Sequence, residues 1–139
     1  MRDEFDLMGC LTINIKHDLY AYYTRGGCGE LKKFLCEHDI ANIGVKKLAR
    51  PPFFFTSLNS SSLTNFKDQY LFLIVGDTMH HYTIYKNEWA SDVLKLNIAR
   101  DNHSSCSLGD YIYVFGGYNF ERQWIDSLEY LNATSMLGK

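Results

Sequence analysis

The stretch Gly109-Asp110-Tyr111-Ile112-Tyr113-Val114-Phe115-Gly116-Gly117-Tyr118 decides how the rest of the chain is interpreted. A Gly-Asp pair is typical of a tight turn, and the aromatic and β-branched residues that follow favour an extended strand. Alternate residues of a strand face opposite sides, so the rings of this run share one face and its aliphatic residues the other. Because both faces are apolar, we expect a strand buried on both sides. The double glycine permits a turn or a close backbone approach that a Cβ would block.

The composition is that of a folded, aromatic-rich chain. Of the 139 residues, 46% are hydrophobic, 15% aromatic and 22% charged, and the formal net charge is −2. A weakly acidic chain without a cluster of basic residues argues against nucleic acid as the main partner. No apolar run approaches the ~18 residues that span a bilayer, and the polar first residues do not resemble a secretory signal. We therefore expect a cytoplasmic protein with no membrane partner.

The combination of turn, aromatic strand and glycine recurs along the chain. Gly26, Gly76 and Gly116 each follow such a strand, at spacings of 50 and 40 residues. A period near 50 residues with four short strands per unit is the pattern of propeller blades. Two segments remain open: the run from Glu30 to Cys36 fits a strand better than a short helical turn, and the polar tract from Asn59 to Thr64 continues the Phe53–Leu58 strand as strand or bulged loop.

Four groups of residues then carry a family resemblance. They are Arg100-x-x-His103-Ser104, Asp110-x-Ile112-Tyr113-Val114-Phe115-Gly116-Gly117, Leu128-Glu129-Tyr130 and Ile84-Tyr85-x-x-Glu88-Trp89. In this order they resemble successive parts of a kelch repeat. The resemblance implies an all-β fold, an incomplete kelch-type β-propeller built of four-stranded antiparallel blades. It departs from the family pattern at Asp77, which replaces a second glycine, and in the first unit, which lacks a Tyr-then-Trp corner.

The repeat divides the chain into four parts. We assign residues 1–9 to an N-terminal tail, 10–49 to a degenerate first kelch-like blade, 50–97 to a second blade and 98–139 to a third blade, truncated before its last strand. A propeller closes with roughly four to eight blades. We therefore expect the chain to be a segment of a longer propeller, or to assemble with the remaining blades or with itself.

The resemblance also assigns structural and functional roles. The motif residues expected to shape the blades are Gly76, Gly116, Gly117, Tyr85, Trp89 and Tyr130; the glycines relieve crowding, and the rings of Trp89 and Tyr130 join the layer between blades. In kelch proteins the connection after the double glycine lies on an open face and commonly helps to bind partners. The expected partner-binding residues are Tyr118, Asn119, Phe120, Arg122 and Trp124, unless Phe120 or Trp124 folds back over the blade. The corresponding loops are Asp77–His80 and Arg25–Glu30.

The expected function is a non-catalytic protein-interaction module that presents these loops to a protein partner of unspecified identity. We expect no catalytic residue, no metal site and no cofactor. His80 and His81 are adjacent on a strand and so face opposite sides, as a polar surface pair rather than joint ligands, and His103 is expected to have a hydrogen-bonded structural role. One alternative is the substrate-recognition part of a cullin-type ubiquitin-ligase adaptor. The other is a fragment of a kelch-fold copper oxidase-like enzyme, although no motif lets the copper ligands be assigned here.

Overall fold

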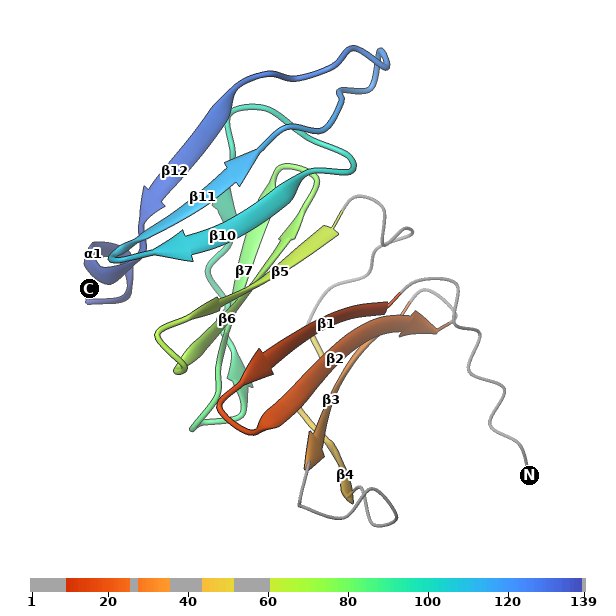
Figure 1. The fold of residues 1–139 in the computed structure, drawn as a ribbon, viewed down its shortest axis with the longest axis vertical. Coiled ribbons are helices and arrows are strands. Elements are labelled where there is room, and N and C mark those ends of the chain that lie inside the picture. The colour runs from red at the N-terminus through yellow and green to blue at the C-terminus, as the bar shows by residue number, and fades with distance from the viewer. Residues whose placement is uncertain (1–9, 26–27, 36–43, 52–60, 139) are drawn as a thin grey trace. The chain divides into compact units, whose positions relative to one another are not determined.

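The computed structural model describes residues 10–25, 28–35, 44–51 and 61–138, and within them the chain is nearly all antiparallel β-sheet (Figure 1). The chain divides into two compact units, Met1–Leu58 and Asn59–Lys139. The expected strand at Phe53–Leu58 lies outside the described residues.

The first unit is one four-stranded sheet. Its strands are β1 (Cys10–Ile15), β2 (Asp18–Arg25), β3 (Cys28–Leu35) and β4 (Gly44–Lys47), each paired with the next along the chain. The strand interpretation of the run beginning at Glu30 is confirmed as far as Leu35. Tyr22 and Leu31 are opposite one another in the register and are almost completely buried. The ring of Tyr22 lies against Gly29, where a Cβ would overlap its hydroxyl.

The second unit begins with a sheet in the order β5-β6-β7-β8. Its strands are β5 (Ser61–Phe66), β6 (Tyr70–Val75), β7 (Thr78–Thr83) and β8 (Glu88–Trp89), and a further short strand, β9 (Leu94–Lys95), also pairs with β7. The polar tract before the first hairpin is thus strand from Ser61 onward, not a bulged loop. The single fourth strand expected between Glu88 and Leu96 is instead two short pieces, and Ala90 between them donates a backbone hydrogen bond to the His81 carbonyl of β7 at 2.9 Å.

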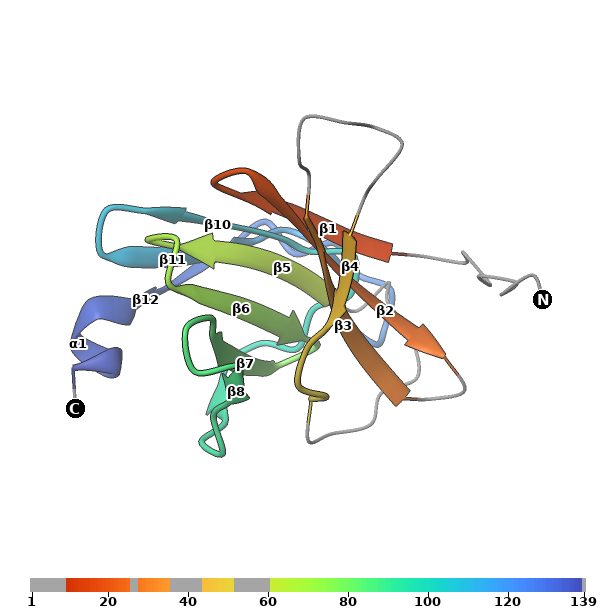
Figure 2. The ribbon, with the colours of Figure 1, turned by 90° about the horizontal axis from the view of Figure 1, so that it is seen from below.

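A three-stranded sheet in the order β10-β11-β12 completes the second unit. Its strands are β10 (Ser104–Leu108), β11 (Tyr111–Phe115) and β12 (Leu128–Asn132). A five-residue helix that the sequence pattern did not predict, α1 (Ala133–Leu137), follows directly, capped by the Asn132 side chain, which accepts a hydrogen bond from the Ser135 N–H at 3.0 Å. Figure 2 shows β10 and β11 running alongside β5 and β6, with α1 at the end of this pair of sheets.

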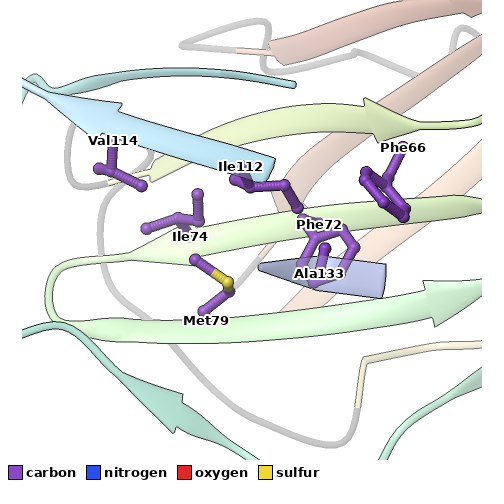
Figure 3. Packing of buried hydrophobic residues seen from close by; sticks show 7 residues of the cluster. All are labelled: Phe66, Phe72, Ile74, Met79, Ile112, Val114 and Ala133. Carbon is purple, nitrogen blue, oxygen red and sulfur yellow. The ribbon is translucent and has the colours of Figure 1, made fainter. Parts of the chain in front are cut away.

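The two sheets of the second unit enclose one apolar core (Figure 3). Its buried members are Phe66, Phe72, Ile74, Met79, Ile112, Val114 and Ala133. The expectation that β11 is buried on both faces is wrong: Ile112 and Val114 are 0% and 1% exposed, but Tyr111 and Phe115 are 37% and 44% exposed. Only the aliphatic face of β11 meets another sheet, so the aromatic face lies open among the described residues.

Hydroxyl groups line the seam where β5 meets β10. Ser105 donates a hydrogen bond to Ser62 at 2.7 Å and also contacts the hydroxyl of Thr64. Ser107 donates to the carbonyl of Asn65 at 2.7 Å. This edge of the interface between the sheets is therefore held by directional bonds, whereas the centre is held by apolar packing.

Candidate partner-binding loop

The connection between β11 and β12 is fixed where it leaves the sheet. Gly116 and Gly117 have φ angles of +71° and +87°, in the left-handed region that disfavours other residues. A Cβ on Gly117 would also overlap the carbonyl oxygen of Asp101. Asp101 and Tyr118 then exchange two backbone hydrogen bonds, of 2.9 and 3.0 Å. The double glycine thus lets the loop start in close contact with the segment that precedes β10.

Asn119 organises the loop from within. Its Oδ1 accepts hydrogen bonds from the N–H groups of Glu121 and Gln123, each at 3.0 Å, and its Nδ2 donates to Oε1 of Gln123 at 3.1 Å. The Asn119 backbone N–H donates to the Gln123 carbonyl at 3.0 Å, and the Arg122 N–H donates to the Asn119 carbonyl at 3.0 Å. A short amide side chain that bonds nearby backbone in this way stabilises a turn. The loop is therefore a hydrogen-bonded turn with a defined shape.

Two large aromatic side chains project from this turn into solvent. Phe120 is 87% exposed and Trp124 is 85% exposed, and Arg122 between them is also exposed. The rings of Trp124 and Tyr118 meet edge to face, with centroids 6.0 Å apart and planes at 84°. Neither Phe120 nor Trp124 folds back over the blade.

The five residues expected to bind a partner therefore divide into two groups. Phe120, Arg122 and Trp124 present their side chains. Tyr118 and Asn119 support them, because Asn119 is occupied within the turn and the half-buried Tyr118 accepts a hydrogen bond from Asn102 Nδ2 at 3.1 Å. The sequence signal for this division was Asn119 itself, since an Asn side chain commonly hydrogen-bonds the backbone two residues further along a turn.

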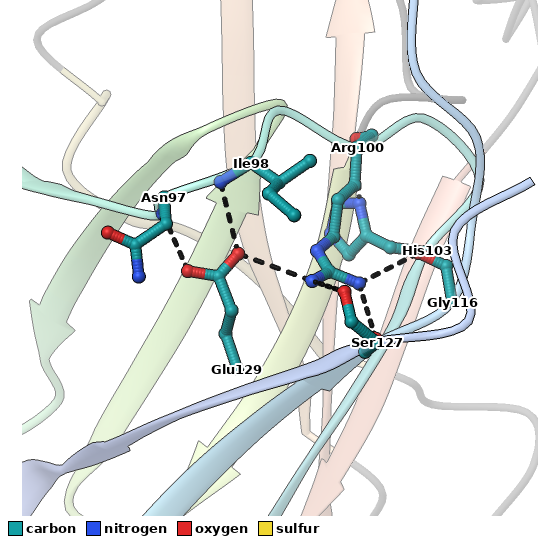
Figure 4. Close-up of polar contacts among 7 residues, drawn as sticks. All are labelled: Asn97, Ile98, Arg100, His103, Gly116, Ser127 and Glu129. Carbon is teal, nitrogen blue, oxygen red and sulfur yellow. Dashed lines mark hydrogen bonds and ion pairs between the residues drawn. The ribbon is translucent and has the colours of Figure 1, made fainter. Parts of the chain in front are cut away.

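Arg100 holds both ends of the connection from beneath (Figure 4). Its side chain is fully buried and donates to the carbonyls of Gly116 at 3.2 Å and Ser127 at 2.7 Å, to the Ser127 hydroxyl at 3.0 Å and to Glu129 at 3.3 Å. Glu129 in turn accepts hydrogen bonds from the N–H groups of Asn97 at 2.6 Å and Ile98 at 3.2 Å. The sequence pattern included Arg100 and Glu129 without revealing that they form an ion pair.

His103 lies next to this network and has the structural role that the sequence suggested. Its Nδ1 lies 3.0 Å from the Arg100 carbonyl and its Nε2 lies 2.9 Å from the Ser62 hydroxyl. A carbonyl can only accept, so Nδ1 carries the proton and Nε2 accepts from Ser62. Burial lowers the pKa of His103, which favours this neutral form.

His80, His81 and the loop expected beside them differ from expectation in part. His80 is only 6% exposed, with its Nε2 3.2 Å from the Thr78 hydroxyl, and His81 stacks on Phe72 with centroids 5.6 Å apart. The two do face opposite sides of β7, but they are not a polar surface pair, because each is covered by neighbouring side chains. The loop expected at Asp77–His80 is a tight turn at Gly76 and Asp77, since β7 already begins at Thr78.

The described residues of the loop expected at Arg25–Glu30 are strand instead. β2 includes Arg25 and β3 begins at Cys28. Residues 26 and 27 lie outside the described part of the chain.

The expected blade-shaping residues have different environments. Gly76 has a φ of +58°, and the Trp89 ring packs on Tyr82 with centroids 5.3 Å apart. Tyr85 is 73% exposed, and Tyr130 is 69% exposed, although it contacts other tyrosine rings of its own sheet. Tyr130 thus belongs to the open aromatic face of the third sheet, and no layer between blades forms around it in the described residues.

Among the described residues, no group of three or more His, Cys, Asp or Glu side chains is arranged to hold a metal ion. No helix in the same part of the chain is long and apolar enough to cross a membrane.

Residues 99–135, which include β10, β11, the loop and β12, match the family described as Kelch motif. The chain carries a kelch repeat. A search of curated proteins finds no match to the sequence. Among 95 solved chains that match this kelch-repeat fold, YjhT aligns with a TM-score of 0.63 and 16% identity over 79% of this chain and 34% of its own. The chain thus spans about a third of the length of YjhT, and its fold is that of an incomplete kelch-type β-propeller.

Proposed function

We propose that the chain is a non-catalytic protein-interaction module, and that the loop Tyr118–Trp124 contacts its protein partner. Kelch repeats generally serve in protein interaction. The observation that supports this loop in particular is the exposure of Phe120 and Trp124, at 87% and 85%, on a hydrogen-bonded turn. Aromatic and arginine side chains dominate the energetics of protein interfaces, and exposing two large rings on one short loop is unfavourable unless a partner covers them.

The rigidity of the loop adds to the argument. Binding costs free energy for every side chain and loop segment that must be ordered. Asn119 already orders the backbone from residue 119 to 123 through its side-chain bonds. The backbone that carries Phe120 and Arg122 therefore needs little further ordering when a partner binds.

A set of matched variants tests the proposal. Partners captured by the purified chain from cell extract are identified by mass spectrometry, prepared separately and titrated against each variant by calorimetry. The double variant Phe120→Ala/Trp124→Ala should weaken binding by roughly 30-fold or more, as for interface hot spots. Tyr85→Ala is the control, because Tyr85 is a similarly exposed aromatic residue outside the loop, and it should bind like the unaltered chain.

Arg122 allows binding and folding to be separated. Arg122 has a φ of +57°, which a glycine adopts without strain. Arg122→Gly should therefore weaken binding through loss of the guanidinium while the melting temperature stays the same or rises. Equal affinity for the unaltered chain and both loop variants would contradict the proposed contact surface, as would an equal loss in Tyr85→Ala.

A further inference from the structure

The outer edge of β12 is open. In the first sheet β4 lies beside β3, and in the second sheet β8 and β9 lie beside β7. In the third sheet β12 pairs with β11 alone, and α1 begins at Ala133, directly after it (Figure 1). Among the described residues, therefore, no strand occupies the position next to β12.

The backbone groups on this edge can be assigned from the register. The Gly116 N–H donates to the Ser127 carbonyl and the Ala133 N–H to the Asp110 carbonyl, at 3.4 and 2.9 Å. Hydrogen-bonded and non-hydrogen-bonded pairs alternate along an antiparallel ladder. The odd-numbered residues of β12 consequently bond to β11, and Leu128, Tyr130 and Asn132 direct their N–H and C=O groups toward the open edge.

The side chains of these three residues are uncharged and two are large. Leu128 and Tyr130 are 51% and 69% exposed, and Tyr130 packs on Tyr111 and Tyr113 with ring centroids 5.9 and 6.2 Å apart. Natural edge strands are usually guarded against pairing by lysines, proline or bulges. β4, the edge strand of the first sheet, carries the exposed Lys46 and Lys47.

β12 has no such guard. Its one charged residue, Glu129, is bound by Arg100 and by two backbone N–H groups on the opposite face of the sheet. An unguarded edge beside exposed apolar side chains is a site for pairing with another strand.

We propose that β12 pairs in antiparallel fashion with β12 of a second copy of this chain, about a twofold axis at Tyr130. In this register Tyr130 lies opposite Tyr130 of the other copy, and Leu128 lies opposite Asn132. Every outward N–H and C=O of the three residues then finds a partner, and the two tyrosine rings meet on the uncharged face. Glu129 lies opposite Leu131 rather than opposite its own copy, so no like charges face each other directly. The strand is thus complementary to itself, and this pairing surface is separate from the loop Tyr118–Trp124.

Sedimentation velocity across a concentration series from micromolar to submillimolar tests the pairing. The unaltered chain should shift from monomer to dimer. Tyr130→Pro removes an N–H that faces the open edge and no bond to β11, which is where a strand tolerates proline, and it should weaken dimerisation by at least roughly tenfold. Leu128→Lys, which leaves the backbone intact, is a second variant expected to do the same. Circular dichroism shows whether each variant is folded.

Tyr111→Ala is the matched control, because Tyr111 shares the exposed face but lies on the central strand β11. It should leave the dimer intact, and hydrogen exchange of the unaltered chain should show the Leu128 and Tyr130 amides becoming protected only at high concentration. A chain that stays monomeric throughout would overturn the proposal and leave the edge to an extended segment of another protein. A dimer that persists in both Tyr130→Pro and Leu128→Lys, or that only Tyr111→Ala dissociates, would overturn it as well.

Discussion

Replacing Arg100 with methionine removes the guanidinium that ties the segment before β10 to β11 and β12. The side chain is fully buried and makes four hydrogen bonds, to Gly116, twice to Ser127 and to Glu129. Methionine is shorter but fills the space of the aliphatic stem of arginine. The variant therefore removes the polar contacts and leaves a smaller cavity than alanine would.

The expected loss of stability follows from these contacts. Removing one partner of a buried ion pair costs about 3–5 kcal/mol, because the other charge remains buried without compensation. Glu129 still accepts hydrogen bonds from the N–H groups of Asn97 and Ile98, at 2.6 and 3.2 Å. The expected loss of stability therefore lies near the lower end of this range. We expect the free energy of unfolding to fall by about 3 kcal/mol, or roughly two orders of magnitude in the unfolding equilibrium constant.

Urea unfolding followed by circular dichroism measures this change. Arg100→Lys should lose less, since an ammonium keeps the charge but cannot reach Glu129 and both carbonyls as a planar fork does. In a Glu129→Gln background, Arg100→Met should cost less than in the unaltered chain if the two residues are coupled. A loss below about 1 kcal/mol, or the same loss in both backgrounds, would refute the reasoning that the ion pair is a main tie between the strands.

Three further predictions concern single residues. Gly117→Ala should destabilise the chain by about 1–3 kcal/mol more than Gly116→Ala in thermal melts, because both have positive φ but only a Cβ on Gly117 would meet the Asp101 carbonyl. The free energy of unfolding should fall as the pH drops below about 6.5, because burial lowers the pKa of His103 and the unfolded chain takes up its proton first; His103→Gln should make denaturant unfolding measured at two pH values less dependent on pH. Asn119→Ala should accelerate hydrogen exchange of the Gln123 amide, which it bonds at 3.0 Å, with little change in the melting temperature; unchanged exchange would show that the backbone alone holds the turn.

The sequence predicted the strands well wherever periodicity and glycine agreed. β6 and β11 have the strand boundaries expected from apolar runs that end at glycine. The fourth strand of the second sheet was harder, because the stretch from Glu88 to Leu96 contains too few apolar residues to specify where pairing stops. The short helix α1 depends on the cap that Asn132 provides to Ser135, and five residues are too few for a helical period to be recognised.

Burial and orientation were the properties that the sequence could not supply. The apolar residues on both faces of β11 are compatible with burial, but whether another sheet packs on a face depends on strands elsewhere in the chain. In the same way, Phe120 and Trp124 have side chains that suit a core or an interface equally well. Their outward direction is set by the left-handed backbone of Gly117 and by the bonds of Asn119, which residue type alone does not specify.

The hydroxyl-lined seam between β5 and β10 has a consequence for how the two sheets are aligned. Apolar contacts are non-directional, so two apolar sheet faces can shift along one another with little change in free energy. The contacts of Ser105 with Ser62 and of Ser107 with the Asn65 carbonyl exist at only one offset between the strands. A slip of one sheet along the other by one residue would separate these hydroxyl groups from their present partners, and a buried polar group without a partner costs free energy. The hydrogen bonds of this seam therefore fix one relative position of the two sheets, where the apolar core alone would allow several.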